Sequence, residues 1–282
     1  MPEPPAAAPA GAAVSEQDVL LATKLHVPGP RPGFVARPRL AEALGGGLVL
    51  VCAPAGFGKT ALLADWLRSG GRPVAWLSLD AGDNDPVRFW RHMVAALDRA
   101  RPGIGERVAP LLGPPPSSFE GLVTALINEL AAQSGENEIV LVLDDYHLID
   151  AGQVHASLAF LLEHLPPGLH LVLASRSDPP LPLARLRARG QLTELRTEEL
   201  RFTAEEAAAL LRESAGAALP GAAVAALVAR TEGWAAGLQL AALSLRGRPD
   251  IAGFVADFGG SHRYILDYLT GEVLDGLSEQ VR

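Results

Sequence analysis

Residues 48–65 read LVLVCAPAGFGKTALLAD, and this stretch decides how the rest of the chain folds. It opens with an apolar run that predicts a buried strand and ends in a helical pattern with Leu62, Leu63, Trp66 and Leu67 on one side. A strand, a glycine loop, Lys-Thr and a helix are together the context of a phosphate-binding loop. Glycine lets the chain bend closely, so backbone N–H groups of the loop and of the first helical turn converge on phosphate.

The candidate phosphate-contacting residues of this loop are Pro54, Ala55, Gly56, Phe57, Gly58, Lys59, Thr60 and Ala61. We expect Lys59 to reach the β- and γ-phosphates and the Thr60 hydroxyl to complete the coordination of Mg²⁺. The usual pattern begins with glycine where this chain has Ala53, so we expect an ordinary φ there and unusual conformations at Gly56 and Gly58.

A glycine-rich turn that binds nothing is the alternative interpretation of this loop. The use of lysine favours function, because Lys24 and Lys59 are the only lysines in a chain rich in arginine. A compact ammonium is thus kept where a forked guanidinium is too bulky.

Composition sets the limits for the rest. The chain has 282 residues, enough for a core domain and a smaller second one. Its net charge of −8 argues against binding nucleic acid or an anionic membrane through its general field. The single cysteine, Cys52, excludes an internal disulfide framework and fits a reducing cytoplasm. No apolar stretch is long enough to cross a bilayer, and the first residues lack the pattern of a signal peptide.

Strand and helix patterns alternate through the first two thirds of the chain. Further strands are predicted at 73–79, 138–145, 169–175 and 192–196, with helices at about 86–100, 118–133 and 153–165. Residues 138–145, EIVLVLDD, are apolar on both faces of a strand, which predicts a parallel sheet covered by helices on each side. We therefore expect an α/β P-loop NTPase domain over residues 19–200, preceded by a disordered Pro/Ala tail over residues 1–18.

Strand signals stop after residue 203. Helices are predicted at 203–214, with Thr203 as N-cap, and at 221–232, 235–245 and 261–281. This predicts a smaller all-helical domain over residues 201–282. The last helix shows no terminating glycine or proline, so we expect the natural protein to continue beyond it.

Three residues that directly follow strands are candidate catalytic groups. Asp144 ends an apolar strand, the position from which P-loop NTPases hold Mg²⁺ opposite the loop threonine. Asp145 is placed to orient the attacking water, although both aspartates would also serve as turn residues. Arg176 follows the next strand and would lie beside the γ-phosphate, the alternative being a surface arginine.

Two segments outside the loop contain residues whose role in ligand binding is less clearly indicated by the sequence. Val35 and Arg37 precede the first strand and are candidates to contact adenine or the phosphates; a surface linker with a solvated arginine is the alternative. Asp80, Asp83 and Asp85 follow the second strand, and we interpret them as caps and turn formers rather than ligands.

The order of these motifs carries a family resemblance. TKLHVP, VARPRL, APAGFGKT, VAWLSLDAGDNDPVRFW, VLVLDDYHLI, LVLASRSDPPLPLARLRARGQLTELR and EGWAAGLQLAALSL follow one another along the chain. The sequence resembles the N-terminal nucleotide-binding region of the MalT-like STAND ATPases, large bacterial transcription activators that end in a LuxR-type helix-turn-helix.

The resemblance implies a switch. In such proteins ATP and an inducer release an inhibited monomer into a multimer, and slow hydrolysis resets it. By resemblance, Lys59 and Thr60 bind phosphate and Mg²⁺, Asp144 and Asp145 form the Walker B pair, and Arg176 is the sensor. ATP or ADP with Mg²⁺ would be the cofactors, in the cytoplasm and away from membranes. Self-association would accompany the ATP state, and DNA and inducer binding would belong to the full-length protein, not this segment.

One family motif departs from its usual form. Many relatives carry Gly-x-Pro in the helical domain against the nucleotide, whereas this chain has Gly233-Trp234-Ala235. Contact between this segment and the base is therefore left open.

Two other functions compete with the switch. An AAA-type or other P-loop ATPase would use its turnover as the function itself, and a degenerate scaffold would bind no nucleotide. A kcat far below the usual enzyme range of about 1–10³ s⁻¹, together with tight nucleotide binding, would favour the switch.

Overall fold

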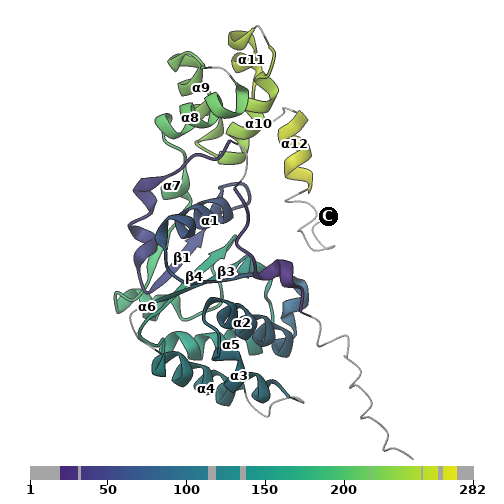
Figure 1. Ribbon diagram of the computed structural model, residues 1–282. Helices are drawn as coiled ribbons and strands as arrows, with labels where there is room; N and C mark the ends of the chain where they lie inside the picture. The colour runs from purple at the N-terminus through teal and green to yellow at the C-terminus, as the bar shows by residue number, and fades with distance from the viewer. Residues whose placement is uncertain are drawn as a thin grey trace, which may run out of the picture.

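The computed structural model describes residues 20–30, 33–113, 119–133, 138–216, 218–248, 250–259 and 263–271. An α/β body and a helical body lie one above the other, with the N-terminal segment running between them (Figure 1). The predicted Pro/Ala tail and the end of the last predicted helix lie outside the described residues.

One parallel sheet of five strands forms the α/β body, in the order β2-β3-β4-β1-β5. The strands are β1 (Leu48–Cys52), β2 (Val74–Ser78), β3 (Ile139–Asp144), β4 (Leu169–Ser175) and β5 (Thr193–Leu195). The predicted parallel sheet is confirmed. Cys52 pairs with Ser175 across β1 and β4, so the loop after β1 starts beside the end of β4.

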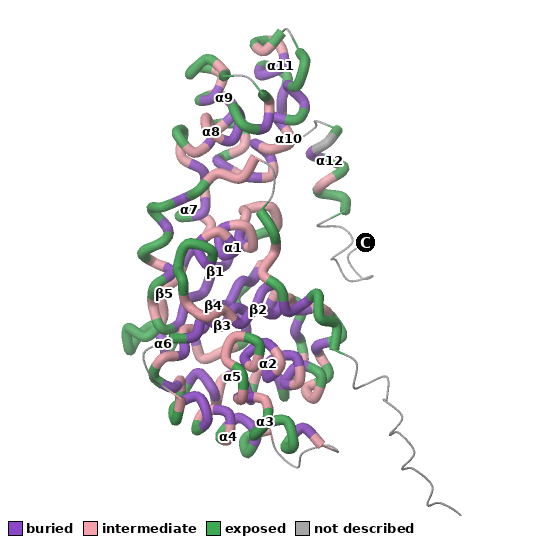
Figure 2. Tube along the Cα trace, in the orientation of Figure 1, coloured by how far each residue is buried: buried purple, intermediate pink, exposed green. Residues whose placement is uncertain are grey.

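The strands of the sheet are largely buried (Figure 2), and their side chains alternate between two cores, one on each face. Leu50 of β1 faces the side where α2 (Pro86–Ala100), α3 (Ile104–Val108), α4 (Phe119–Ala132) and α5 (Gly152–Glu163) gather. Val49 and Val51 face α1 (Lys59–Gly70) on the other side. The period of two along a strand thus explains why residues 48–52 are apolar throughout.

Short helices depart from the expected pattern. The structure has a short helix α3 and a 3₁₀ turn at Ala109–Leu112 that were not predicted. Ile104, Val108 and Leu112 recur every four residues and are buried, a signal too short to stand out between prolines and glycines. The helices α6 (Leu183–Ala188) and α7 (Thr197–Leu200) were also not predicted.

The helical body has its own core. It comprises α8 (Ala204–Ala215), α9 (Gly221–Thr231), α10 (Ala235–Leu245), α11 (Ile251–Asp257) and α12 (Arg263–Leu269). The predicted N-cap is confirmed, since the Thr203 side chain accepts from the Glu206 N–H in a capping box. The short α11, which Asp250 caps, was not predicted.

A buried ion pair ties the N-terminal segment to the α/β body. The Lys24 ammonium contacts Asp83, whose other oxygen lies 2.9 Å from His92 Nδ1. Hydrogen bonds from His92 and Lys24 outweigh burial and lower the pKa of Asp83 to about 2. Asp80 and Asp85 are helix caps, as predicted, whereas Asp83 is a capping-box residue that also anchors Lys24.

Candidate nucleotide-binding site

The loop between β1 and α1 has the conformation that its glycines suggest. Gly56 and Gly58 have φ values of 79° and 77°, in the left-handed region. Among the described non-glycine residues only Asp145 and Glu232 have positive φ, so Ala53 is unstrained as expected. Gly58 is the N-cap of α1, which places the free N–H groups of the first helical turn at the loop.

Lys59 is folded against the loop that it follows. Its ammonium donates to the carbonyl oxygens of Ala53, at 2.7 Å, and Pro54, at 3.1 Å. Burial lowers the pKa of Lys59, while the carboxylates of Asp145 and Asp144 oppose that change. The ammonium thus has two loop carbonyls as hydrogen-bond partners, which a bound phosphate would replace.

Thr60 and Asp144 meet where a magnesium ion is expected. The Thr60 hydroxyl donates to Asp144 Oδ2 at 2.8 Å, while Asp144 Oδ1 is buried and has no hydrogen-bond partner among the described residues. Burial, followed by the charge of Asp145, raises the pKa of Asp144 to about 6.

An unsatisfied buried carboxylate oxygen beside a hydroxyl fits Mg²⁺, which prefers oxygen ligands and keeps several waters and phosphate oxygens. In the described ranges no group of three or more His, Cys, Asp or Glu side chains is placed to hold a metal ion. Thr60 and Asp144 would therefore hold Mg²⁺ together with phosphate and water, and the bound ion would neutralise phosphate charge.

Asp145 and Arg176 stand at the edge of the site. Asp145 has a left-handed backbone, φ 59° and ψ 39°, and its side chain is 41% exposed. Its Oδ1 lies 3.9 Å from Nδ1 of His147, whose pKa is lowered by burial. Arg176 directly follows β4 and is half-buried. Asp145 and Arg176 line one cavity with Lys59 and Thr60.

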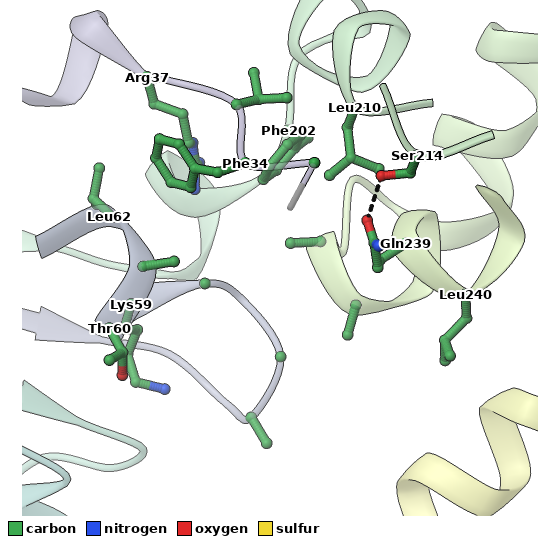
Figure 3. Close-up of a pocket in the computed structure, with 18 of the residues that line it drawn as sticks. Phe34, Arg37, Lys59, Thr60, Leu62, Phe202, Leu210, Ser214, Gln239 and Leu240 are labelled. Atoms are coloured by element: carbon green, nitrogen blue, oxygen red, sulfur yellow. Dashed lines mark hydrogen bonds between the residues drawn. The ribbon is translucent and has the colours of Figure 1, made fainter. Parts of the chain in front are cut away.

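This cavity has a volume of about 730 Å³ and lies between the two bodies (Figure 3). One end is formed by Gly56, Gly58, Lys59 and Thr60. The distal end is formed by the N-terminal segment and by the helical body, and its lining includes Phe34, Val35, Phe202, Leu210, Ser214, Gln239 and Leu240. The shape, polar at one end and largely apolar at the other, is that of a pocket for a phosphorylated ligand with an apolar body.

Both candidate residues of the N-terminal segment, Val35 and Arg37, line the cavity. Val35 is half-buried and packs on the helical core. Arg37 is only 4% exposed, which excludes a solvated arginine, and its Nη2 donates to the Leu200 carbonyl oxygen at 2.6 Å. It also stacks on Phe202, with 4.6 Å from its Cζ to the ring centroid. Arg37 thus fixes the segment against the junction of the two bodies, and adenine contact by Val35 and Arg37 stays a prediction.

Two residues of the helical body hydrogen-bond to carbonyl groups of the phosphate-binding loop. The Trp234 indole N–H donates to the Ala55 carbonyl oxygen at 3.0 Å, and the Ala236 N–H donates to that of Gly56 at 2.9 Å. A Cβ on Gly56 would lie 2.6 Å from Trp234 Nε1 and 2.7 Å from the Ala236 methyl group. Trp234 therefore contacts the loop, while Ala235 and Ala236 line the cavity.

The structure brings most candidate residues to this cavity. Those that line it are Val35, Arg37, Ala55, Gly56, Gly58, Lys59, Thr60, Ala61, Asp145 and Arg176. Of the others, Asp144 lies behind Thr60, Phe57 packs on the core beside α1, and Pro54 is exposed but offers its carbonyl to Lys59. Sequence reasoning found Val35 but missed the lining residues Leu210, Ser214, Gln239 and Leu240, because these lie on α8 and α10, where a periodic pattern indicates only a core.

Known proteins resemble both the sequence and the fold. Residues 37–174 match the AAA ATPase domain family. The serine/threonine-protein kinase PknK of Mycobacterium tuberculosis is 38% identical over 93% of this chain and 24% of its own length. The HTH-type transcriptional regulator MalT of Serratia proteamaculans is 37% identical over 94% of this chain and 30% of its own length. The chain therefore spans less than a third of these relatives.

Two solved structures share the fold. A Walker-type ATPase of Pyrococcus abyssi matches with a TM-score of 0.53, 15% identity and coverage of 90% of this chain and 77% of that one. A STAND protein with a tetratricopeptide-repeat sensor from Pyrococcus horikoshii matches with a TM-score of 0.51 and 15% identity, over 74% of this chain and 30% of that one. None of the helices in the described ranges has the length and apolar character needed to cross a lipid bilayer. The chain has a P-loop and a five-stranded parallel sheet, its residues 37–174 match the AAA ATPase domain family, and it is similar to parts of MalT and PknK.

Proposed function

We propose that this chain is a nucleotide-controlled switch that binds ATP with Mg²⁺ and hydrolyses it slowly. The observation that carries the proposal is the shared cavity: the α/β body supplies its phosphate end and the helical body most of its distal end. A ligand that spans the cavity contacts both bodies, so its binding free energy depends on how they pack.

The two hydrogen bonds from the helical body support this coupling. A phosphate-binding loop presents its N–H groups to the ligand, and here the carbonyls of Ala55 and Gly56 are bound from the helical side. Any adjustment of the loop around a γ-phosphate therefore acts on the first turn of α10. ATP and ADP differ in that phosphate, which gives them different affinities for the two packings.

Hydrolysis would use the groups at the phosphate end. Lys59 would bind the β- and γ-phosphates, and Thr60 and Asp144 would hold Mg²⁺. Asp145, partly exposed at the cavity edge, would orient the water that attacks the γ-phosphorus atom. Arg176 would stabilise the charge on the departing γ-phosphoryl group and report its loss.

The names of the relatives also favour a switch. One is named a protein kinase and the other a helix-turn-helix regulator, yet both share this region. A region that a protein kinase and a transcriptional regulator share is better suited to regulating their activities than to performing either of them. DNA binding, inducer binding and self-association in the ATP state are then proposed properties of a longer protein.

A combined binding and turnover experiment tests the proposal. We expect tight binding of ATP and ADP with a kcat well below about 1 s⁻¹. In the control variant Asp145→Asn, binding should persist and hydrolysis should slow. Fast turnover in the wild type would instead support an ATPase whose turnover is its function, and absence of binding would refute both.

A further inference from the structure

Two neutral polar side chains meet at the distal end of the cavity, whose lining also includes Glu213 and Arg246. The Ser214 hydroxyl, on α8, donates to Gln239 Oε1, on α10, at 2.9 Å (Figure 3). Ser214 is 2% exposed and Gln239 is half-buried, and both line the cavity. A half-buried amide at a cavity wall can hydrogen-bond a ligand that enters the cavity.

The amide of Gln239 is only partly satisfied. No acceptor in the part of the chain that the structure describes takes an N–H of Gln239 Nε2, and Oε1 retains a second lone pair. Among the charged side chains that line the cavity, Arg246 donates through Nε to the Ser214 carbonyl at 2.6 Å, Arg37 donates to the Leu200 carbonyl, and Glu213 is exposed. Gln239 therefore offers the cavity one donor beside one acceptor.

Apolar side chains line the cavity together with this pair. Phe34, Phe202, Leu210 and Leu240 line the same end of the cavity. Gly33 closes over the pair: it has φ +75°, and a Cβ there would lie 2.4 Å from Ser214 Oγ. The segment that carries Phe34 thus lies directly on the hydroxyl that orients Gln239.

We propose that Gln239, held by Ser214, binds the edge of the nucleobase and selects adenine. Adenine presents its exocyclic amine, a donor, beside a ring-nitrogen acceptor, and a glutamine amide pairs with that arrangement through Oε1 and Nε2. The Ser214 hydroxyl, by occupying one lone pair of Oε1, fixes the plane of the amide. This inference rests on the proposed nucleotide binding and adds to it the group that reads the base.

A chemical double-mutant cycle tests the inference. The Kd values of ATP and of purine riboside triphosphate, which lacks the 6-amino group, are measured for the wild type and for Gln239→Leu. The wild type should bind ATP about tenfold more tightly than the analogue, the fold-change of one good hydrogen bond. In Gln239→Leu the two ligands should bind equally. A preference for ATP that survives in the variant would overturn the inference.

Two controls separate this inference from the proposed function. Inorganic tripolyphosphate has no base, so wild type and Gln239→Leu should bind it equally; if the wild type binds neither tripolyphosphate nor ATP, the nucleotide site itself is refuted. Gln239→Glu keeps the shape of the side chain but offers only acceptors, so the ring nitrogen of adenine loses its donor and ATP should bind at least severalfold more weakly than to the wild type. An unchanged ATP affinity in that variant would also count against Gln239.

Discussion

Two buried lysine–aspartate clusters in the α/β body differ in how completely they are satisfied. Near the N-terminus, Asp83 is 0% exposed and both of its oxygens have partners, His92 on one and Lys24 on the other. At the phosphate-binding loop, Asp144 is 2% exposed, but within the described part of the chain only Oδ2 has a partner.

The pKa values of Asp83 and Asp144 differ accordingly. The pKa of Asp83 is lowered to about 2 by its partners, whereas that of Asp144 is raised to about 6 by burial. A buried carboxylate whose two oxygens both have partners offers none to a ligand, whereas one that lacks a partner keeps an oxygen for a ligand. The comparison supports a structural role for the first cluster and the proposed ligand-binding role for the second.

The largest expected effect separates the two lysines. Lys59→Met should weaken ATP binding on the order of a hundredfold or more, because Lys59 would bind the β- and γ-phosphates. Lys24→Met should leave affinity unchanged but lower the free energy of unfolding by about 3–5 kcal/mol, since it leaves Asp83 without its buried cation. Calorimetric titration and denaturant unfolding of both variants measure the two effects. The comparison fails if Lys24→Met weakens binding in the folded protein.

The two aspartates should respond to pH with opposite signs in the magnesium-free protein. Asp144 has a raised pKa, so its stabilising contribution is complete below its ordinary value and is lost as pH rises through about 6. The loss amounts to about 3 kcal/mol and should vanish in Asp144→Asn. Asp83 has a lowered pKa, so its contribution of about 2 kcal/mol is present above its ordinary value and is lost as pH falls toward 2. Unfolding free energies from pH 2 to pH 8 should show both changes, and equal profiles in wild type and Asp144→Asn would contradict the first.

Gly56 and Gly58 differ in whether the helical body packs against them, and this difference can be tested by substitution. Both have similar positive φ, so alanine at either should cost about 1–2 kcal/mol in backbone strain. Gly56→Ala also pushes its Cβ into Trp234 and Ala236, whereas the nearest atom for Gly58→Ala is 4.0 Å away. Unfolding of the nucleotide-free variants should therefore show the larger loss for Gly56→Ala. Equal losses would mean that the helical body does not press on the loop in solution.

The smallest effect concerns a single hydrogen bond. Trp234→Phe keeps an aromatic ring but removes the donor to the Ala55 carbonyl, which should cost about 1 kcal/mol of packing between the bodies. Limited proteolysis of the segment between the two bodies should become faster. Hydrogen exchange of the amides in β1 and β4, which reports the stability of the sheet, should stay the same. If the variant resists proteolysis as well as the wild type does, the hydrogen bond from Trp234 does not stabilise the packing of the two bodies.

Sequence alone predicted the sheet and the phosphate end of the site. Those features rest on local patterns: an apolar run such as residues 48–52, and a loop whose glycines and Lys-Thr are contiguous. The distal end could not be predicted, because Ser214 and Gln239 are 25 residues apart and meet only through the packing of α8 on α10. The contact of Trp234 with Ala55 spans 179 positions, and no local signal encodes it.

Hydrogen exchange at the Ala236 amide tests the central claim most directly, because this N–H bonds the Gly56 carbonyl of the phosphate-binding loop. Exchange would be compared in the nucleotide-free protein and in protein saturated with ADP or with a non-hydrolysable ATP analogue. If occupancy controls how the bodies pack, protection of this amide should differ between the ADP and ATP-analogue states. Equal protection in the two saturated states would contradict a nucleotide-controlled switch.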